Sequence, residues 1–227
     1  MGLLILNQYI QAQVGVVLNQ HPEFSVSESK DSIILSGTLI MNAEYDNIPL
    51  YDEYEVEITV SNRFPEEVPQ VRELGKNIPS AFGHFYDNGV LCLGAACELY
   101  DFLAERKSLI SFIDEIIISY FYSASYFKRY GTVPFGERSH GVKGIEESYM
   151  DRYSLSDRNV LMQILLYLTG YQRYRGHMEC PCGSGKKFRD CHGGKLLKDI
   201  MSPLNKHYQA DAFQILAAYI NERKDSN

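Results

Sequence analysis

The sequence has no hydrophobic run long enough for a transmembrane helix, which needs about 20 consecutive apolar residues. Its opening residues, MGLLILNQYI, lack both the basic start and the small-residue cleavage site of a secretory signal peptide. Internal repeats and low-complexity segments are also missing from the 227 residues. We therefore expect a soluble, cytoplasmic protein with no membrane partner and one sizeable core, with or without an appendage.

Positive charge is scarce in the first part of the chain. Residues 1–60 contain nine acidic residues and one basic residue, Lys30, and the whole chain has a net charge of -7. The balance reverses over residues 171–198, which contain seven lysines and arginines and two acidic residues. This asymmetry indicates an acidic domain joined to a small basic module, and the overall acidity argues against direct binding to nucleic acid.

Hydrophobic periodicity predicts an α+β fold, with helices and half-buried antiparallel strands in separate segments. Residues 54–60 alternate apolar with polar side chains, and residues 33–41 form a second apolar segment. Pro65 and Pro69 then impose an irregular bend before another short extended piece. The expected helices span residues 3–19, 104–127, 156–170 (with Ser156 as its cap) and 210–223.

An odd number of cysteines, five, argues against a disulfide framework and favours thiol chemistry or metal binding. Three of them lie in the segment CPCGSGKKFRDCH, whose candidate ligands are Cys180, Cys182, Cys191 and His192. Three thiolates and one imidazole complete a tetrahedral zinc site without an open position, so we predict structural zinc. The segment resembles the SEC-C motif of the SecA translocase, which implies a knuckle that docks on partner macromolecules.

The other two cysteines, Cys92 and Cys97, lie among small residues after an Asn-Gly turn. Around Cys92 the chain runs from strands through a Pro-containing bend and a His-led loop to GVLCL, and then to a long helix. This order resembles the ubiquitin-conjugating-enzyme fold, although the residue-level match is confined to residues 64–93. The resemblance implies that Cys92 is the acceptor cysteine of a conjugating enzyme.

More narrowly, LCLG, GERSHGVKGIEESY and CPCGSGKK together are similar to bacterial conjugating-enzyme homologues of short type II CBASS antiphage operons. The resemblance implies that Cys92 carries the C-terminus of a cGAS-like nucleotide cyclase as a thioester and passes it to an amine of a protein target. A cysteine thiol suits such an exchange because it is intrinsically nucleophilic and needs little help from a general base.

Eukaryotic relatives place an oxyanion-stabilising Asn two residues after the loop His, where this sequence has Tyr86. We expect His84, Asn88 or a residue from elsewhere to take this role, and His140 in a Gly-rich loop is our candidate base or donor. A purely structural role for either histidine stays open.

Several alternatives to this interpretation also stay open. Cys97 is the second candidate nucleophile, either thiol could be inert core packing, and a Cys92–Cys97 disulfide is sterically conceivable. The protein could instead be a noncatalytic binding module, or a Cys-His hydrolase that releases the same C-terminus. We predict a catalytic domain over residues 1–150, a helical extension over 151–178, and a zinc knuckle with a terminal helix over 179–227.

Overall fold

The computed structural model describes residues 8–135, 139 and 141–225 and divides into two compact units. The first, here called the sheet unit, comprises Met1–Gly94 and Glu105–Glu137. The second, the helical unit, comprises Ala95–Ala104 and Arg138–Asn227. The predicted boundaries therefore differ from the observed ones, because the cysteine-rich segment packs with the preceding helices and with the helix that follows Cys92.

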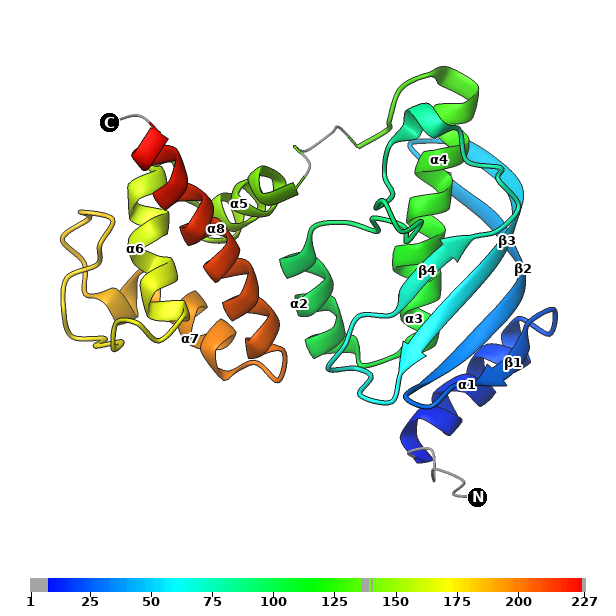
Figure 1. The fold of residues 1–227 in the computed structure, drawn as a ribbon, viewed down its shortest axis with the longest axis horizontal. Helices are drawn as coiled ribbons and strands as arrows, with labels where there is room; N and C mark the ends of the chain where they lie inside the picture. Colours follow the sequence, from blue (N-terminus) through cyan, green and yellow to red (C-terminus); the bar gives the residue numbers. More distant parts are fainter. Residues whose placement is uncertain (1–7, 136–138, 140, 226–227) are drawn as a thin grey trace. The chain divides into compact units, whose positions relative to one another are not determined.

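The sheet unit is built on a four-stranded antiparallel sheet in the order β1-β2-β3-β4 (Figure 1). The two long central strands form a hairpin whose two-residue turn, Asp46 and Asn47, has φ angles of 50° and 60°. Both residue types tolerate the left-handed conformation that such tight hairpin turns require. The strands are β1 (Ser25–Glu28), β2 (Ser32–Tyr45), β3 (Ile48–Ser61) and β4 (Gln70–Glu73).

The alternation predicted in β3 is confirmed. Tyr54, Val56, Ile58 and Val60 are at most 1% exposed. Glu55, which lies between Tyr54 and Val56, is exposed on the opposite face. The buried face packs against α4 (Ile118–Tyr130), which contacts both central strands (Figure 1).

Among the described residues, the sheet unit also contains the 3-10 turn η1 (Ser80–Phe82) and helical segments near the start of the chain and before α4. The first helix, α1 (Gln8–Gln20), buries Ile10, Val14 and Val17 and packs against α3 (Leu109–Ser111). The chain continues from α3 through the π-helical turns η2 (Phe112–Ile117) into α4. The predicted helix over residues 104–127 therefore begins later than expected, where Ser108 Oγ accepts a hydrogen bond from Ser111 N.

The segment after Cys92, for which no helix was predicted before residue 104, forms α2 (Ala96–Arg106). Its small residues suit a helix because alanine has the highest helix propensity. The helix buries Cys97, Tyr100 and Leu103 at intervals of three residues, which places all three side chains on one face. Most of this helix was therefore not predicted from the sequence.

In the described part of the helical unit, four more α-helices follow α2. Helix α6 (Arg158–Leu168) is capped by Asp157, which accepts from Asn159 N at 2.7 Å, rather than by the predicted Ser156. None of the helices among the described residues combines the length and apolar character needed to cross a membrane. The four are α5 (Gly141–Arg152), α6 (Arg158–Leu168), α7 (Gly193–Met201) and α8 (Asn205–Asp225).

Candidate metal centre and cysteine hairpin

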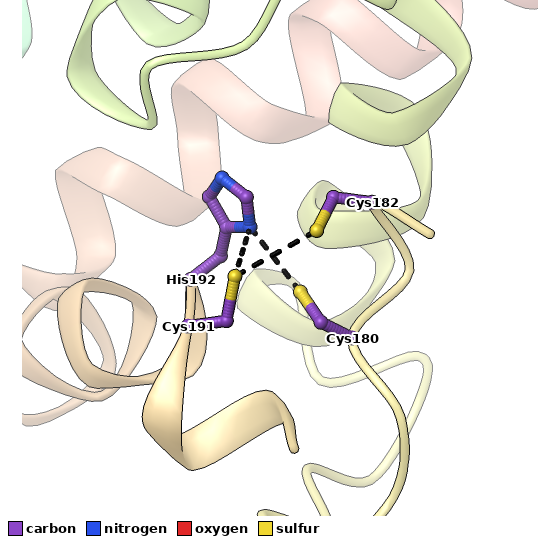
Figure 2. Close-up of side chains that lie close together, drawn as sticks. All are labelled: Cys180, Cys182, Cys191 and His192. Carbon is purple, nitrogen blue, oxygen red and sulfur yellow. Dashed lines mark hydrogen bonds between the residues drawn. The ribbon is translucent and has the colours of Figure 1, made fainter. Parts of the chain in front are cut away.

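The four predicted metal ligands, Cys180, Cys182, Cys191 and His192, converge in the helical unit (Figure 2). Their donor atoms all lie within 4.8 Å of one another. Nδ1 of His192 lies 3.2 Å from Cys180 Sγ and 3.3 Å from Cys191 Sγ, and the Sγ atoms of Cys182 and Cys191 are 3.6 Å apart. In a tetrahedral zinc site neighbouring donors lie about 3.5–3.8 Å apart. The cluster therefore fits one tetrahedral ion.

Backbone hydrogen bonds hold the first two ligands in a tight loop. Cys180 N donates to Lys186 O at 2.9 Å, and Gly183 N donates back to Cys180 O at 3.2 Å. Gly183 and Gly185 have φ angles of 74° and 70°. Glycine adopts this left-handed conformation without steric cost, so the loop can turn both thiols toward one point.

The second pair of ligands is placed by helical structure. Cys191 follows the 3-10 turn η3 (Phe188–Asp190), and His192 directly precedes α7. Phe188 is 1% exposed, and its ring lies 5.1 Å from the rings of Tyr167 and Tyr174. The ligand loop is therefore anchored to α6, which contains Tyr167, as well as to α7.

A close approach explains the glycine after His192. A Cβ atom on Gly193 would lie 2.6 Å from both Phe188 O and Tyr174 Oη, which are distances that real Cβ atoms do not show. The Tyr174 hydroxyl is itself buried without a hydrogen-bond partner among the described residues. The start of α7 is thus packed so tightly against the ligand loop that a side chain would displace it.

The thiols of the cluster differ in their surroundings. Burial raises the pKa of Cys180, whereas hydrogen bonding with Ser184, 3.2 Å away, lowers the pKa of Cys182. A metal ion binds thiolates and displaces their protons, so binding would be coupled to proton release.

The candidate nucleophile, Cys92, lies at the end of a short hairpin here called the cysteine hairpin, residues 84–92. Tyr86 N donates to Val90 O at 2.8 Å, Phe85 pairs with Leu91, and Cys92 N donates to His84 O at 2.9 Å. The hairpin thus places Cys92 directly across from His84. Leu91 N also donates to Val71 O at 2.8 Å, which fixes the hairpin to β4.

The residues considered for the oxyanion role have defined places in this hairpin. The side-chain oxygen of Asn88 accepts from Val90 N at 3.1 Å within the turn, so only its NH2 group could serve an oxyanion. Tyr86 is 56% exposed, and the ring of His84 lies 4.6 Å from that of Phe82. His140 lies outside the described residues.

Cys97 has different surroundings from those of Cys92. It is 1% exposed in the helical unit, and its Sγ lies 3.4 Å from the hydroxyl oxygen of Ser148, to which it donates. Burial raises the pKa of the Cys97 thiol, which disfavours the thiolate. Cys92 is half-buried, and both thiols are free.

Sequence reasoning missed one residue beside Cys92. The hydroxyl of Tyr120 donates to His84 O at 2.7 Å, the same carbonyl oxygen that accepts from Cys92 N. The sequence placed Tyr120 only within the helix predicted over residues 104–127. No motif marks a tyrosine hydroxyl that reaches a distant loop, so only the fold could reveal it.

Residues 179–194 match the family model of the SEC-C motif. The matched segment contains all four clustered side chains, so motif and geometry agree on a metal site near the C-terminus. Searches of curated proteins and of solved structures gave no match. The resemblance of residues 64–93 to ubiquitin-conjugating enzymes therefore stays a prediction.

Proposed function

We propose that the protein is an acyl carrier of the ubiquitin-conjugating type, with Cys92 as the acceptor thiol. The observation that supports this most directly is the cysteine hairpin, which presents a half-buried, free thiol opposite His84. In the same chain Cys97 is buried and bonded to Ser148, so it is the poorer candidate. The proposed acyl group is the C-terminus of a cGAS-like nucleotide cyclase.

The chemistry is an exchange of thioesters followed by transfer to an amine. The Cys92 thiolate attacks the carbonyl carbon of a thioester at the partner's C-terminus and the new C–S bond forms. The donor's C–S bond breaks, and the donor leaves as a thiolate that takes up the proton that Cys92 lost. An amine of the target then attacks this carbonyl carbon. The C–N bond forms, Cys92 leaves as a thiolate, and a base takes the excess proton from nitrogen.

His84 is the proposed base because it lies across the hairpin from Cys92. The Cys92 N–H is engaged by the His84 carbonyl, so it does not serve as an oxyanion donor in this arrangement. The Asn88 NH2 group and His140 are the remaining candidates for that role. The case for His140 rests on its place in the Gly-rich loop of the sequence.

We further propose that the ion of the Cys180 cluster is zinc and that its role is structural. Four protein ligands leave no position for a substrate, and a set of three thiolates and one imidazole is typical of structural zinc. Lys186, Lys187 and Arg189 lie in or next to the ligand loop and would give a docked partner a basic surface. An acidic partner surface would suit that charge.

The acyl-carrier proposal is tested with a thioester donor. The cyclase, prepared as a C-terminal 2-mercaptoethanesulfonate thioester, is mixed with the protein, and adducts are read by intact mass and by non-reducing electrophoresis. We expect an adduct that thiol reductants cleave and that Cys92→Ala abolishes. Cys97→Ala is the matched control, because it removes the other thiol outside the metal cluster, and it should retain the adduct.

The alternatives give different results in the same experiment. An adduct that survives Cys92→Ala but disappears in Cys97→Ala would make Cys97 the nucleophile. Release of the free C-terminus without transfer to any added amine would favour the hydrolase. Tight binding without an adduct under any condition would leave the noncatalytic binding module as the better explanation.

A further inference from the structure

Two hydrogen-bond donors converge on the backbone carbonyl of His84. One is the N–H of Cys92 at 2.9 Å, and the other is the hydroxyl of Tyr120 at 2.7 Å. A carbonyl oxygen has two lone pairs, so this acceptor is fully used. The carbonyl thus joins Cys92 to Tyr120 of α4, which lies 28 residues further along the chain.

The Tyr120 side chain is held rigidly. It is 6% exposed, and its ring packs edge-on against Phe82 and Phe121 with centroids 5.6 and 5.5 Å away. Burial raises the pKa of Tyr120, and the neighbouring Cys92 adds to this increase. The hydroxyl therefore stays protonated, and able to donate, throughout the physiological pH range.

The helix that carries Tyr120 contains an irregularity just before it. The π-helical turns η2 end at Ile117, and α4 begins at Ile118. Such wider turns shift the faces of the following helix by about one residue, and they occur frequently at functional sites. After this shift α4 directs Phe121 onto Tyr54 of the sheet, with centroids 4.2 Å apart, and Tyr120 onto the cysteine hairpin.

We propose that Tyr120 is the positioning residue of Cys92. Its hydroxyl fixes the His84 carbonyl, and that carbonyl fixes the Cys92 amide, so the sulfur is presented to an incoming acyl group in one orientation. Tyr120 acts through this carbonyl and does not itself enter the reaction. The catalytic consequence of this inference rests on the proposed function. The two hydrogen bonds to the His84 carbonyl, here called the tether, can be measured independently of that function.

The test compares two tyrosines of the same helix. Tyr120→Phe removes the hydroxyl and keeps the ring. Tyr122→Phe is the matched control, because the Tyr122 hydroxyl donates to Ile48 O at 2.9 Å, at the far end of the β2–β3 hairpin, and its ring is also buried. Incorporation of 4-aminophenylalanine at position 120 restores a donor without restoring the hydroxyl.

Hydrogen exchange of the Cys92 amide directly measures how firmly its N–H is bonded to the His84 carbonyl. We expect exchange about 3- to 10-fold faster in Tyr120→Phe, unchanged in Tyr122→Phe, and restored by 4-aminophenylalanine. Acylation of Cys92 by the thioester donor should slow by about tenfold in the first variant only, because misplacement of a reacting atom is costly. Rescue by the new donor separates positioning from a general loss of packing.

Failure of each proposal has its own signature. Equal exchange of the Cys92 amide in the wild type and both variants, or an equal increase in both variants, would overturn the positioning role. If the wild type accepts no acyl group while Cys92 exchange still depends on position 120, the acyl-carrier function fails and the tether stands. If the wild type is acylated and Tyr120→Phe is acylated equally fast, the function stands and positioning fails.

Discussion

The interior of the sheet unit is almost entirely apolar, whereas that of the helical unit contains charged groups. In the sheet unit a buried hydrogen bond joins the Tyr54 hydroxyl to Ser125 Oγ at 2.7 Å, and Ser125 Oγ also donates to the carboxylate of Asp52 at 3.1 Å, whose side chain is 27% exposed. The helical unit buries the carboxylates of Asp199 and Asp211, which are 1% and 5% exposed. One unit therefore depends mainly on hydrophobic burial, and the other on specific partners for its polar groups.

The centre of the polar network is Arg152, whose side chain is 5% exposed. Its Nε donates to Asp199 at 2.9 Å and one Nη donates to Asp101 at 2.8 Å, so one guanidinium joins α5, α7 and α2. Tyr153 also donates to Asp199, at 2.6 Å. Short helices with little apolar surface are thus linked by charge-assisted hydrogen bonds and by the metal cluster.

The largest expected effect comes from metal removal. Because Phe188 packs the ligand loop against α6, and α7 contacts both α6 and α8, chelation should unfold the helical unit and not only the tail after Glu179. Structural zinc sites contribute about 10–16 kcal/mol of apparent binding free energy, which exceeds the stability of most small domains. Hydrogen-exchange mass spectrometry should show protection lost in α6 and α8 and retained in β2 and β3.

Cys191→Ser should reproduce the effect of chelation, and Cys92→Ser, which leaves the ligands intact, should not. Elemental analysis of the purified wild type should find about one zinc per chain. Equal loss of protection in β2 and β3 would show that the two units do not differ in their dependence on metal.

The next largest effect is expected from the buried guanidinium. Arg152→Met leaves Asp199 buried without its charge partner, which should lower the free energy of unfolding of the helical unit by about 3–5 kcal/mol. Arg158→Met is the matched control, because Arg158 bonds Glu146 and Glu222 but its side chain is 38% exposed. It should cost at most about 1 kcal/mol. Urea titration followed by hydrogen exchange in α5 and α7 measures the loss of stability in both variants. Equal losses in Arg152→Met and Arg158→Met would contradict the special role of the buried guanidinium.

The difference between the apolar interior of the sheet unit and the polar network of the helical unit also explains what could be predicted from the sequence. Apolar periodicity follows directly from burial on one face, so the central strands β2 and β3 and the main helices of the sheet unit were predictable. Strand β1 was not, because all four of its residues are exposed. The metal ligands were predictable because a metal requires particular residue types at short spacing. The Arg152 network was not predictable, because Arg152 bonds to aspartates that lie 47 and 51 positions away in the sequence. Arginine and aspartate are also the residue types of ordinary surface charges, so nothing in the sequence distinguishes these three.

Local competition explains the errors at the ends of the helices. Both Ser156 and Asp157 are good caps, and the choice depends on which side chain reaches a free N–H, here that of Asn159. The helix predicted from residue 104 left out most of α2, which is stabilised by burial of Cys97 and Tyr100. The link from Tyr120 to the cysteine hairpin depends on the π-helical turns η2, which no residue pattern predicted.

The smallest of these effects concerns pH and acts only on the helical unit. Burial raises the pKa of Asp211 from 3.8 to about 6, although Tyr149, which donates to it at 3.1 Å, and His207 partly offset the increase. A carboxyl group with a raised pKa stabilises the fold fully below its unfolded pKa, and this stability is lost as the pH rises through 6. The ionised Asp211 should therefore cost up to about 3 kcal/mol at pH 8.

Asp211→Asn keeps an acceptor for Tyr149 and removes the charge. We expect it to stabilise the helical unit by about 1–3 kcal/mol at pH 8 and to change little at pH 4, as measured by urea titration at both pH values. Asp101→Asn is a control of opposite sign: burial raises the pKa of Asp101, but hydrogen bonds from Arg152 and Tyr208 bring it below its ordinary value. That variant should lower stability at pH 8. A stabilisation by Asp211→Asn that is equal at pH 4 and pH 8 would mean that the charge of Asp211 is not its cause.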